Sequence, residues 1–266
     1  MNVVVQQGVV TPVGAELRRG ARNWLRSFAL MLRMEWVGAR QWAPMMVIVQ
    51  FMMGAGMAVM YGFFYPEVTP TIALYITTGI PVLALIPMGF VLVPGGIGQQ
   101  RMAGSFDFMW SLPTPRSAQV SAMFSLYTLL ALPGTVLALL VASWRYGVEL
   151  QVSPLIVPAA LLCAVMSVTV GAAMGLAISN PMITNLISNA LIFVVLLFTP
   201  IVFPASNLPD WLLRVHEVLP FHHMAVAIRS GLTDGLVTGT TTSFLVLGAW
   251  TLAGAGLTVW VVGRRR

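Results

Sequence analysis

Three histidines in the last quarter of the chain are the residues best suited to chemistry. His216, His222 and His223 lie near two carboxylates, Glu217 and Asp234. Imidazole and carboxylate groups are common zinc ligands, so a metal site is one interpretation. The other is that these are ordinary polar residues of an interfacial loop, and we favour it. We therefore predict no metal site and no catalytic group in this chain, and a chelator assay would separate the two interpretations.

Phosphate binding is a second chemical possibility, because residues 94–98 read PGGIG. A P-loop requires a lysine followed by Ser or Thr after its glycines. All 14 basic residues of this chain are Arg, so it cannot contain a P-loop. We expect the glycine-rich run to end a helix instead. We accordingly predict no cofactor in this chain.

The composition indicates a membrane protein. Hydrophobic residues make up 58% of the chain and charged residues only 8%, against about 25% charged in a typical soluble domain. The net charge of +6 does not indicate nucleic-acid binding, because the arginines follow a membrane topology. The single cysteine, Cys163, lies in an apolar run and has no partner for an intramolecular disulfide.

Charge-free windows predict six membrane-spanning helices, since one span needs about 20 apolar residues. The longest window, between Glu149 and Asp210, is split at Asn180-Pro181, because a residue before proline is driven out of the helical region. The predicted spans are 42–64, 71–97, 119–143, 155–178, 183–203 and 242–262. The predicted fold class is an all-α membrane protein in a single domain.

The distribution of arginine predicts the orientation. With the N-terminus inside, eleven arginines fall in cytoplasmic segments and three, Arg145, Arg214 and Arg229, fall outside. The positive-inside rule then places both termini in the cytoplasm. We predict a multi-pass protein of the cell membrane, either an inner or a plasma membrane.

Residues 15–41 predict an amphipathic helix that lies in the membrane interface. At 100° per residue one face carries Arg18, Arg22, Arg26, Arg33 and Arg40, and the opposite face carries Leu17, Trp24, Phe28, Met31 and Leu32. Such a helix contacts the lipid bilayer, with arginine toward anionic headgroups. Glu35 projects from the apolar side and needs a partner there. We hypothesise an ion pair with Arg101 or another nearby Arg.

The segment 99–116, QQRMAGSFDFMWSLPTPR, has the size and patterning of a docking element. We assign contact with a partner protein to its charged, small and apolar residues: Arg101, Gly104, Ser105, Phe106, Asp107, Phe108, Leu112, Pro113 and Arg116. Phe106, Phe108 and Leu112 are expected to insert together into a groove on that partner. Residues 204–235 form a second unusual segment, whose short helical pieces are interrupted by proline. We interpret it as an outer re-entrant segment before the last span.

Few polar residues lie within the predicted spans. Thr77 and Thr78 lie in the second span, and Asn185 and Asn189 lie four residues apart on one face of the fifth. These asparagines either join helices or line a substrate pathway, and the sequence leaves both open. Gly171 and Gly175 form a G-x-x-x-G pattern that favours close helix packing.

Two regions of the chain match a known family. The first has Gln100-Arg101, Gly104-Ser105, Asp107, Met109 and Leu112-Pro113-Thr114-Pro115-Arg116, and the second has Phe203-Pro204, Leu208-Pro209, Trp211, Leu219-Pro220 and Arg229. In this order and spacing the chain resembles the membrane subunit of type-2 ATP-binding-cassette (ABC) exporters, the family of drug, polysaccharide and lipid exporters. It departs from the family pattern where glutamine replaces the usual acidic residue before Arg101 and where Leu219 replaces Asn.

The resemblance implies a permease subunit that pairs with a second copy or a paralogue and is driven by separate ABC ATPase subunits at the cytoplasmic face. ATP and Mg²⁺ would bind those partners, so this chain would not itself be an enzyme. The resemblance also implies coupling through 99–116 and Glu35. The second and fifth spans would line the pathway of an amphipathic drug, lipid or glycan.

A secondary transporter or channel without an ATPase is the alternative. Such proteins normally carry ionisable residues inside their spans. All eight acidic residues lie in predicted loops or interfaces, which leaves no obvious proton or sodium carrier. Identification of the subunits that copurify with the chain would decide between the two.

Overall fold

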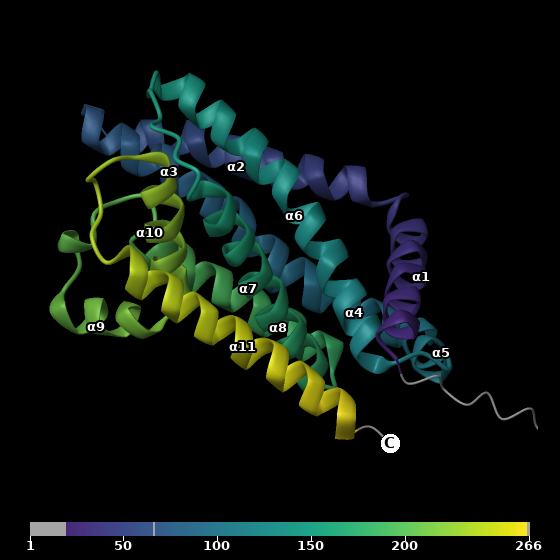
Figure 1. Cartoon of the computed structure of the whole chain (residues 1–266). Coiled ribbons are helices and arrows are strands. Elements are labelled where there is room, and N and C mark those ends of the chain that lie inside the picture. Colours follow the sequence, from purple (N-terminus) through teal and green to yellow (C-terminus); the bar gives the residue numbers. More distant parts are fainter. Residues whose placement is uncertain (1–19, 66, 265–266) are drawn as a thin grey trace, which may run out of the picture.

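The described part of this computed structural model, residues 20–65 and 67–264, is built from helices and contains no strand. The helices in chain order are α1 (Ala21–Ala39), α2 (Ala43–Phe64), α3 (Pro70–Pro87), η1 (Met88–Leu92), α4 (Val93–Met102), α5 (Ser105–Ser111), α6 (Arg116–Tyr146), α7 (Ile156–Ala177), α8 (Pro181–Phe198), η2 (Ala205–Asn207), α9 (Asp210–Val218), α10 (Pro220–Leu232) and α11 (Thr240–Arg264). The predicted all-α fold is confirmed (Figure 1).

Within the described residues, six helices are long and apolar enough to cross a membrane. They are α2, the continuous unit α3–η1–α4, then α6, α7, α8 and α11. Most of their ends lie within three residues of the sequence-based spans. The fifth span is shorter than predicted, because α8 ends at Phe198, one residue ahead of the Thr199-Pro200 pair. Asn180 starts this helix by accepting a hydrogen bond from the backbone N–H of Met182 at 2.9 Å.

The expectation that residues 94–98 end the second span is wrong. The helix continues through them as α4 and ends at Met102. The turn follows at Gly104, whose φ of 70° lies in the left-handed region that favours glycine. The earlier glycines instead allow close packing: a Cβ at Gly98 would meet the Cβ of Pro181 at 3.0 Å. The glycine run is therefore a helix-packing surface.

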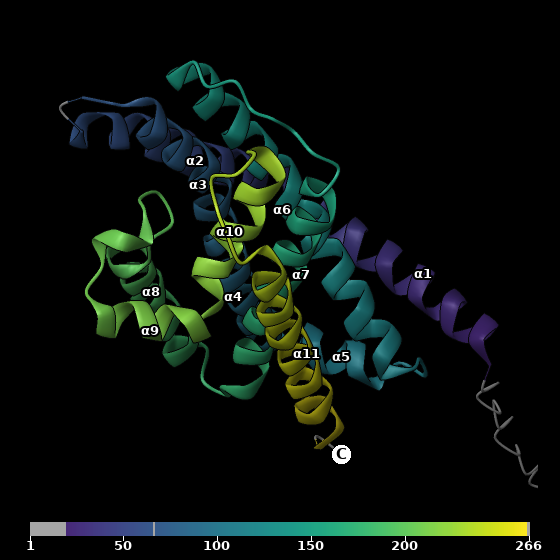
Figure 2. The same ribbon diagram turned by 60° about the vertical axis from the view of Figure 1, so that its left-hand side comes forward.

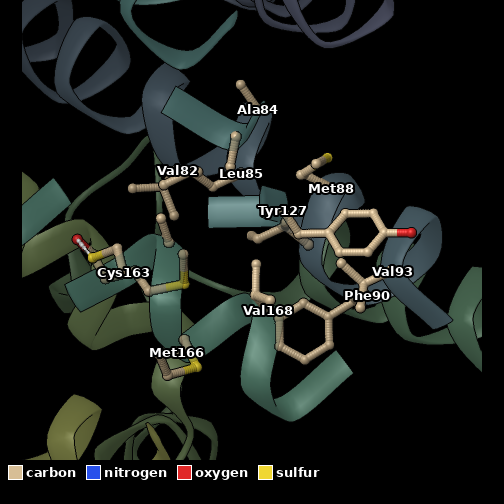
Figure 3. Close-up of a cluster of buried hydrophobic side chains, with 14 of the residues drawn as sticks. Val82, Ala84, Leu85, Met88, Phe90, Val93, Tyr127, Cys163, Met166 and Val168 are labelled. Atoms are coloured by element: carbon tan, nitrogen blue, oxygen red, sulfur yellow. Dashed lines mark hydrogen bonds between the residues drawn. The ribbon is translucent and has the colours of Figure 1, made fainter. Parts of the chain in front are cut away.

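The unit α3–η1–α4 forms the centre of the core (Figure 3). Its π-helical segment η1 lies after Pro87 and presents the buried Phe90 to the neighbouring helices. A Cβ on Gly171 of α7 would collide with the carbonyl of Gly89, and one on Gly175 would meet Pro94 Cα at 2.8 Å. The predicted packing role of the G-x-x-x-G pattern is thus confirmed.

The bundle has two distinct ends. One end carries α5, α1 beside α6, and the last turns of α11, and is called the α5 end here (Figures 1 and 2). The opposite end carries α9 and α10 and is called the re-entrant end. Helix α10 has 13 residues, or about 20 Å at 1.5 Å per residue, so it is too short to span a bilayer. It is buried among α3, α7 and α11, and its re-entrant character stays a prediction.

Candidate functional site

The N-terminal helix α1 attaches to the first part of α6. Trp24 Nε1 donates a hydrogen bond to Ser117 Oγ at 2.9 Å, and Trp24 stacks on Phe28 with ring centroids 5.5 Å apart. Met31 on the same side is buried. The four described arginines of the predicted polar face are exposed: Arg22, Arg26, Arg33 and Arg40. Arg18 and Leu17 lie outside the described residues.

Helix α5 and its two flanking turns are held in place by polar contacts. Ser105 Oγ donates to the Gln100 carbonyl at 3.2 Å, across the turn at Gly104. On the other side, Gln119 Nε2 donates to the Met109 carbonyl at 2.8 Å and to Thr114 Oγ1 at 2.7 Å. Helix α5 is therefore fixed to both α4 and α6, so a force applied to α5 reaches both helices.

The apolar residues of α5 do not form one docking set as predicted. Phe108 is 63% exposed, and Met102 before the turn is 66% exposed, whereas Phe106 is only 6% exposed. The Phe106 ring packs within the chain, 5.3 Å below the guanidinium of Arg101. Leu112 is partly buried and Pro113 is exposed. The side chain of Asp107 lies outside what the structure describes.

The two arginines of the 99–116 segment reach other spans. Arg101 donates to the carbonyls of Leu176 (2.8 Å) and Ile178 (2.7 Å), where α7 ends. The carbonyls at a helix C-terminus lack partners within the helix, and a cation placed there also interacts favourably with the helix dipole. Arg116 Nη1 donates to the Val262 carbonyl of α11 at 2.9 Å. The segment is thus bonded to the ends of two further spans.

Glu35 lies in a small pocket together with Gln100, Phe106 and Gln119. The predicted pair with Arg101 is not formed: within the described residues Glu35 has no ion pair, and both terminal nitrogens of Arg101 bond to the end of α7. Burial raises the pKa of the Glu35 carboxyl. The other described side chains that line this pocket are neutral amides and apolar groups.

The four predicted pathway residues lie in two separate places. Thr77 and Thr78 are fully buried near the re-entrant end, where Thr78 Oγ1 accepts a hydrogen bond from Arg229 Nε at 3.0 Å. Asn185 and Asn189 lie in the first half of α8, which begins toward the α5 end, and both are exposed. Asn189 Nδ2 donates to the Asn185 carbonyl at 2.8 Å. The structure does not bring the threonines and asparagines together.

Asn185 lines a cleft of about 490 Å³ between α2, α4, α6 and α8. The other polar groups on its wall belong to Gln99, Gln100 and Tyr127, and Trp42 also lines it. Sequence reasoning did not select Tyr127, because a tyrosine in an apolar span gives no sign of what it faces. The cleft combines an apolar wall with a few polar groups, which is typical of small-molecule sites.

Helix α8 is mostly uncovered in the single chain. Its exposed face carries large apolar side chains, including Met182 (79% exposed), Leu186 (70%) and Leu197 (70%). The two asparagine side chains share this helix with them. A face with this composition fits contact with lipid or with another protein chain.

The histidines make hydrogen bonds that connect helices. His216 Nε2 bonds to the Phe198 carbonyl at 2.9 Å, and His223 bonds to Ser243 Oγ at 3.0 Å and the Glu217 carbonyl at 2.9 Å. Burial lowers the pKa of His216. Among residues 20–65 and 67–264, no group of three or more His, Cys, Asp or Glu is placed to hold a metal ion.

Gln50 is a buried polar residue that sequence reasoning missed. Its Nε2 donates to the Ala131 carbonyl (2.7 Å), Thr135 Oγ1 (3.1 Å) and the Ala84 carbonyl (3.3 Å). These bonds join the first three spans. The available signal was a single amide in the middle of an otherwise apolar window.

The chain matches a known family. A family model described as "ABC-2 type transporter" matches residues 26–233, well over half of the chain. This range includes most of α1, the α5 segment and the re-entrant helix α10. No curated protein matches the chain.

Proposed function

Since the chain belongs to the ABC-2 type transporter family, and so is a permease component of an ABC transporter, we propose that it forms an exporter as a dimer and is driven by separate ATPase subunits. The α5 end faces the cytoplasm, where those subunits hydrolyse ATP with Mg²⁺. The second permease is an identical copy or a paralogue. This chain supplies the pathway and carries no catalytic group.

The observation that carries the proposal is the exposed apolar tip of the α5 segment. Phe108 stands out from α5, a helix that lies outside the six spans, and the exposed Met102 ends the second span just before it. Aromatic side chains that become buried on binding are frequent anchors of protein interfaces. Because Gln119 and Ser105 fix the ends of this helix to its neighbours, the tip is presented in one orientation.

Force from the ATPase would spread through three bonded connections. Arg101 connects the segment to the end of α7, Arg116 connects it to α11, and Trp24 connects α1 to α6. A displacement of α5 therefore acts on several spans at once. Such coupled movement of packed helices is what a switch between inward-facing and outward-facing states requires.

We place the substrate pathway along the exposed face of α8 and the adjacent cleft, at the contact between two permeases. Asn185 and Asn189 would be costly against lipid but favourable against a polar substrate group or a partner chain. The apolar wall around them suits the apolar part of an amphipathic drug, lipid or glycan. Thr77 and Thr78 would contribute only in a different conformation, since they are buried in this one.

The test is Phe108→Ala in the coexpressed permease and ATPase. Truncation of an interface hot spot costs about 2 kcal/mol, or roughly thirtyfold in affinity, so the ATPase should no longer copurify and substrate-stimulated hydrolysis should fall. Phe63→Ala is the matched control, because Phe63 is 81% exposed but lies on α2 toward the opposite end. If Phe108→Ala retains the ATPase and its stimulation as fully as Phe63→Ala does, the docking role of α5 is refuted.

A further inference from the structure

A cleft of about 290 Å³ lies at the re-entrant end, away from α5 and from the cleft beside α8. It is enclosed by α10, by the first half of α3 and by the connections 200–206 and 236–238. Its polar lining comes from Tyr75, Ser206, His222, Arg229 and Thr238. No acidic residue is among the described residues that line it. Its volume is near the lower limit for small-ligand sites.

Arg229 forms the buried wall of this cleft. The side chain is only 1% exposed, and it contacts only neutral groups: Thr78 Oγ1 at 3.0 Å, the Ile201 carbonyl at 2.6 Å and the Tyr75 carbonyl at 3.4 Å. The Tyr75 ring lies 4.2 Å from the guanidinium carbon. A buried cation is normally paired with an anion. Here no described carboxylate forms an ion pair with it.

Arg229 has unused hydrogen-bonding capacity at the cleft. The hydrogen bonds of Arg229 to other described residues use Nε and Nη2, and Nη1 bonds to no described residue. The Nδ1 atom of His222 is fully buried, so it is not available to a ligand in the cleft. Both residues line the same cleft as the hydroxyl-bearing Ser206 and Thr238. The wall therefore combines a positive charge with hydroxyl groups, and no acidic side chain is among the described residues that line it.

We propose that this cleft binds a phosphate oxyanion, which neutralises the positive charge of the Arg229 guanidinium. A guanidinium matches phosphate in geometry, and charge-assisted hydrogen bonds of this kind are about twice as strong as neutral ones. The oxyanion accepts from Arg229 Nη1 and from the hydroxyls of Ser206 and Thr238. The phosphate comes either from a lipid headgroup of the adjacent leaflet or from a soluble phosphate. This site does not depend on the proposed export function.

Replacing Arg229 would not test the site cleanly, because the same side chain connects α10 to α3. Ser206→Asp is the better variant. It places a carboxylate at the cleft on an exposed residue of the short helix η2. Asn207→Asp is the matched control: it adds the same charge at the next residue of η2, which is exposed and does not line the cleft.

The experiment measures equilibrium binding of radiolabelled inorganic phosphate to the permease–ATPase complex in nonionic detergent, at ionic strength fixed with chloride. The ATPase is blocked by omission of nucleotide and Mg²⁺. A second arm titrates phosphatidylglycerol into the same complex and counts retained lipid. We expect saturable binding of one phosphate per permease chain, weakened at least tenfold by Ser206→Asp and less than twofold by Asn207→Asp.

The two arms separate the sources. Binding of inorganic phosphate that Ser206→Asp removes identifies a soluble ligand, and binding of phosphatidylglycerol alone with the same variant pattern identifies a lipid headgroup. Absence of saturable binding in both arms overturns the proposal. Equal binding by the Ser206→Asp and Asn207→Asp variants overturns it as well, because the oxyanion would then lie elsewhere.

Discussion

Gln50 is expected to contribute directly to the stability of the bundle. Its Nε2 bonds to three oxygens of α3 and α6, and hydrogen bonds between spans are worth about 0.6 kcal/mol each on average and at most about 1.7. Gln50→Leu removes these bonds while keeping the side-chain volume similar. Thr135 Oγ1 still donates to the Ala131 carbonyl at 2.7 Å, so the change strands few polar groups. The buried Oε1 of Gln50, which has no partner, is removed as well, which offsets part of the loss.

We therefore expect Gln50→Leu to lower the free energy of unfolding by about 1–2 kcal/mol. The assay is denaturant unfolding in mixed micelles, followed by tryptophan fluorescence. Thr77→Val is the control, because Thr77 is equally buried but its hydroxyl bonds to no described residue. That change should leave stability the same or raise it slightly. Equal losses in the two variants would refute the reasoning, since hydrogen bonding would then not distinguish the two sites.

Two further predictions concern Glu35 and Asn189. Burial raises the pKa of the Glu35 carboxyl, so the protonated form favours the docked α1. The contribution of this group to folding stability is therefore fully present below pH 4.5 and is lost as the pH rises through the folded pKa. Glu35→Gln should thus raise the melting temperature of the complex at pH 7 and flatten the pH dependence of that temperature. Glu67→Gln is the control, because Glu67 is exposed and its replacement should do neither. A lower melting temperature for Glu35→Gln would instead indicate that Glu35 forms an ion pair in the complex. In an Asn189→Cys variant that also carries Cys163→Ala, the new thiol should react with a membrane-impermeant thiol reagent. The extent of this reaction should change when ATP is trapped on the partner. Failure to react in every nucleotide state would place α8 against lipid or protein alone.

Features set by local composition and backbone sterics could be predicted from the sequence. Six apolar stretches, the break at Asn180-Pro181 and the short pieces before the last span follow from side-chain hydrophobicity and from the restriction that proline imposes. The family-like pattern of 99–116 also predicted a docking segment, and that role stays a prediction. These signals depend on neighbours in the chain, so they do not require knowledge of the packing.

Only the tertiary structure decided which apolar side chain faces which surroundings. In a membrane both the lipid-facing and the protein-facing sides of a helix are apolar, so periodicity does not separate them. Phe106 and Phe108 are alike in sequence, yet one packs under Arg101 and the other is exposed.

The polar contacts that organise the protein also join residues far apart in the chain. Arg229 and Thr78 are 151 residues apart, and Gln50 and Thr135 are 85 apart. A sequence shows that such groups exist in an apolar setting and must find partners. It does not show which partners they find, because that depends on the crossing of helices brought together by glycines such as Gly89 and Gly171.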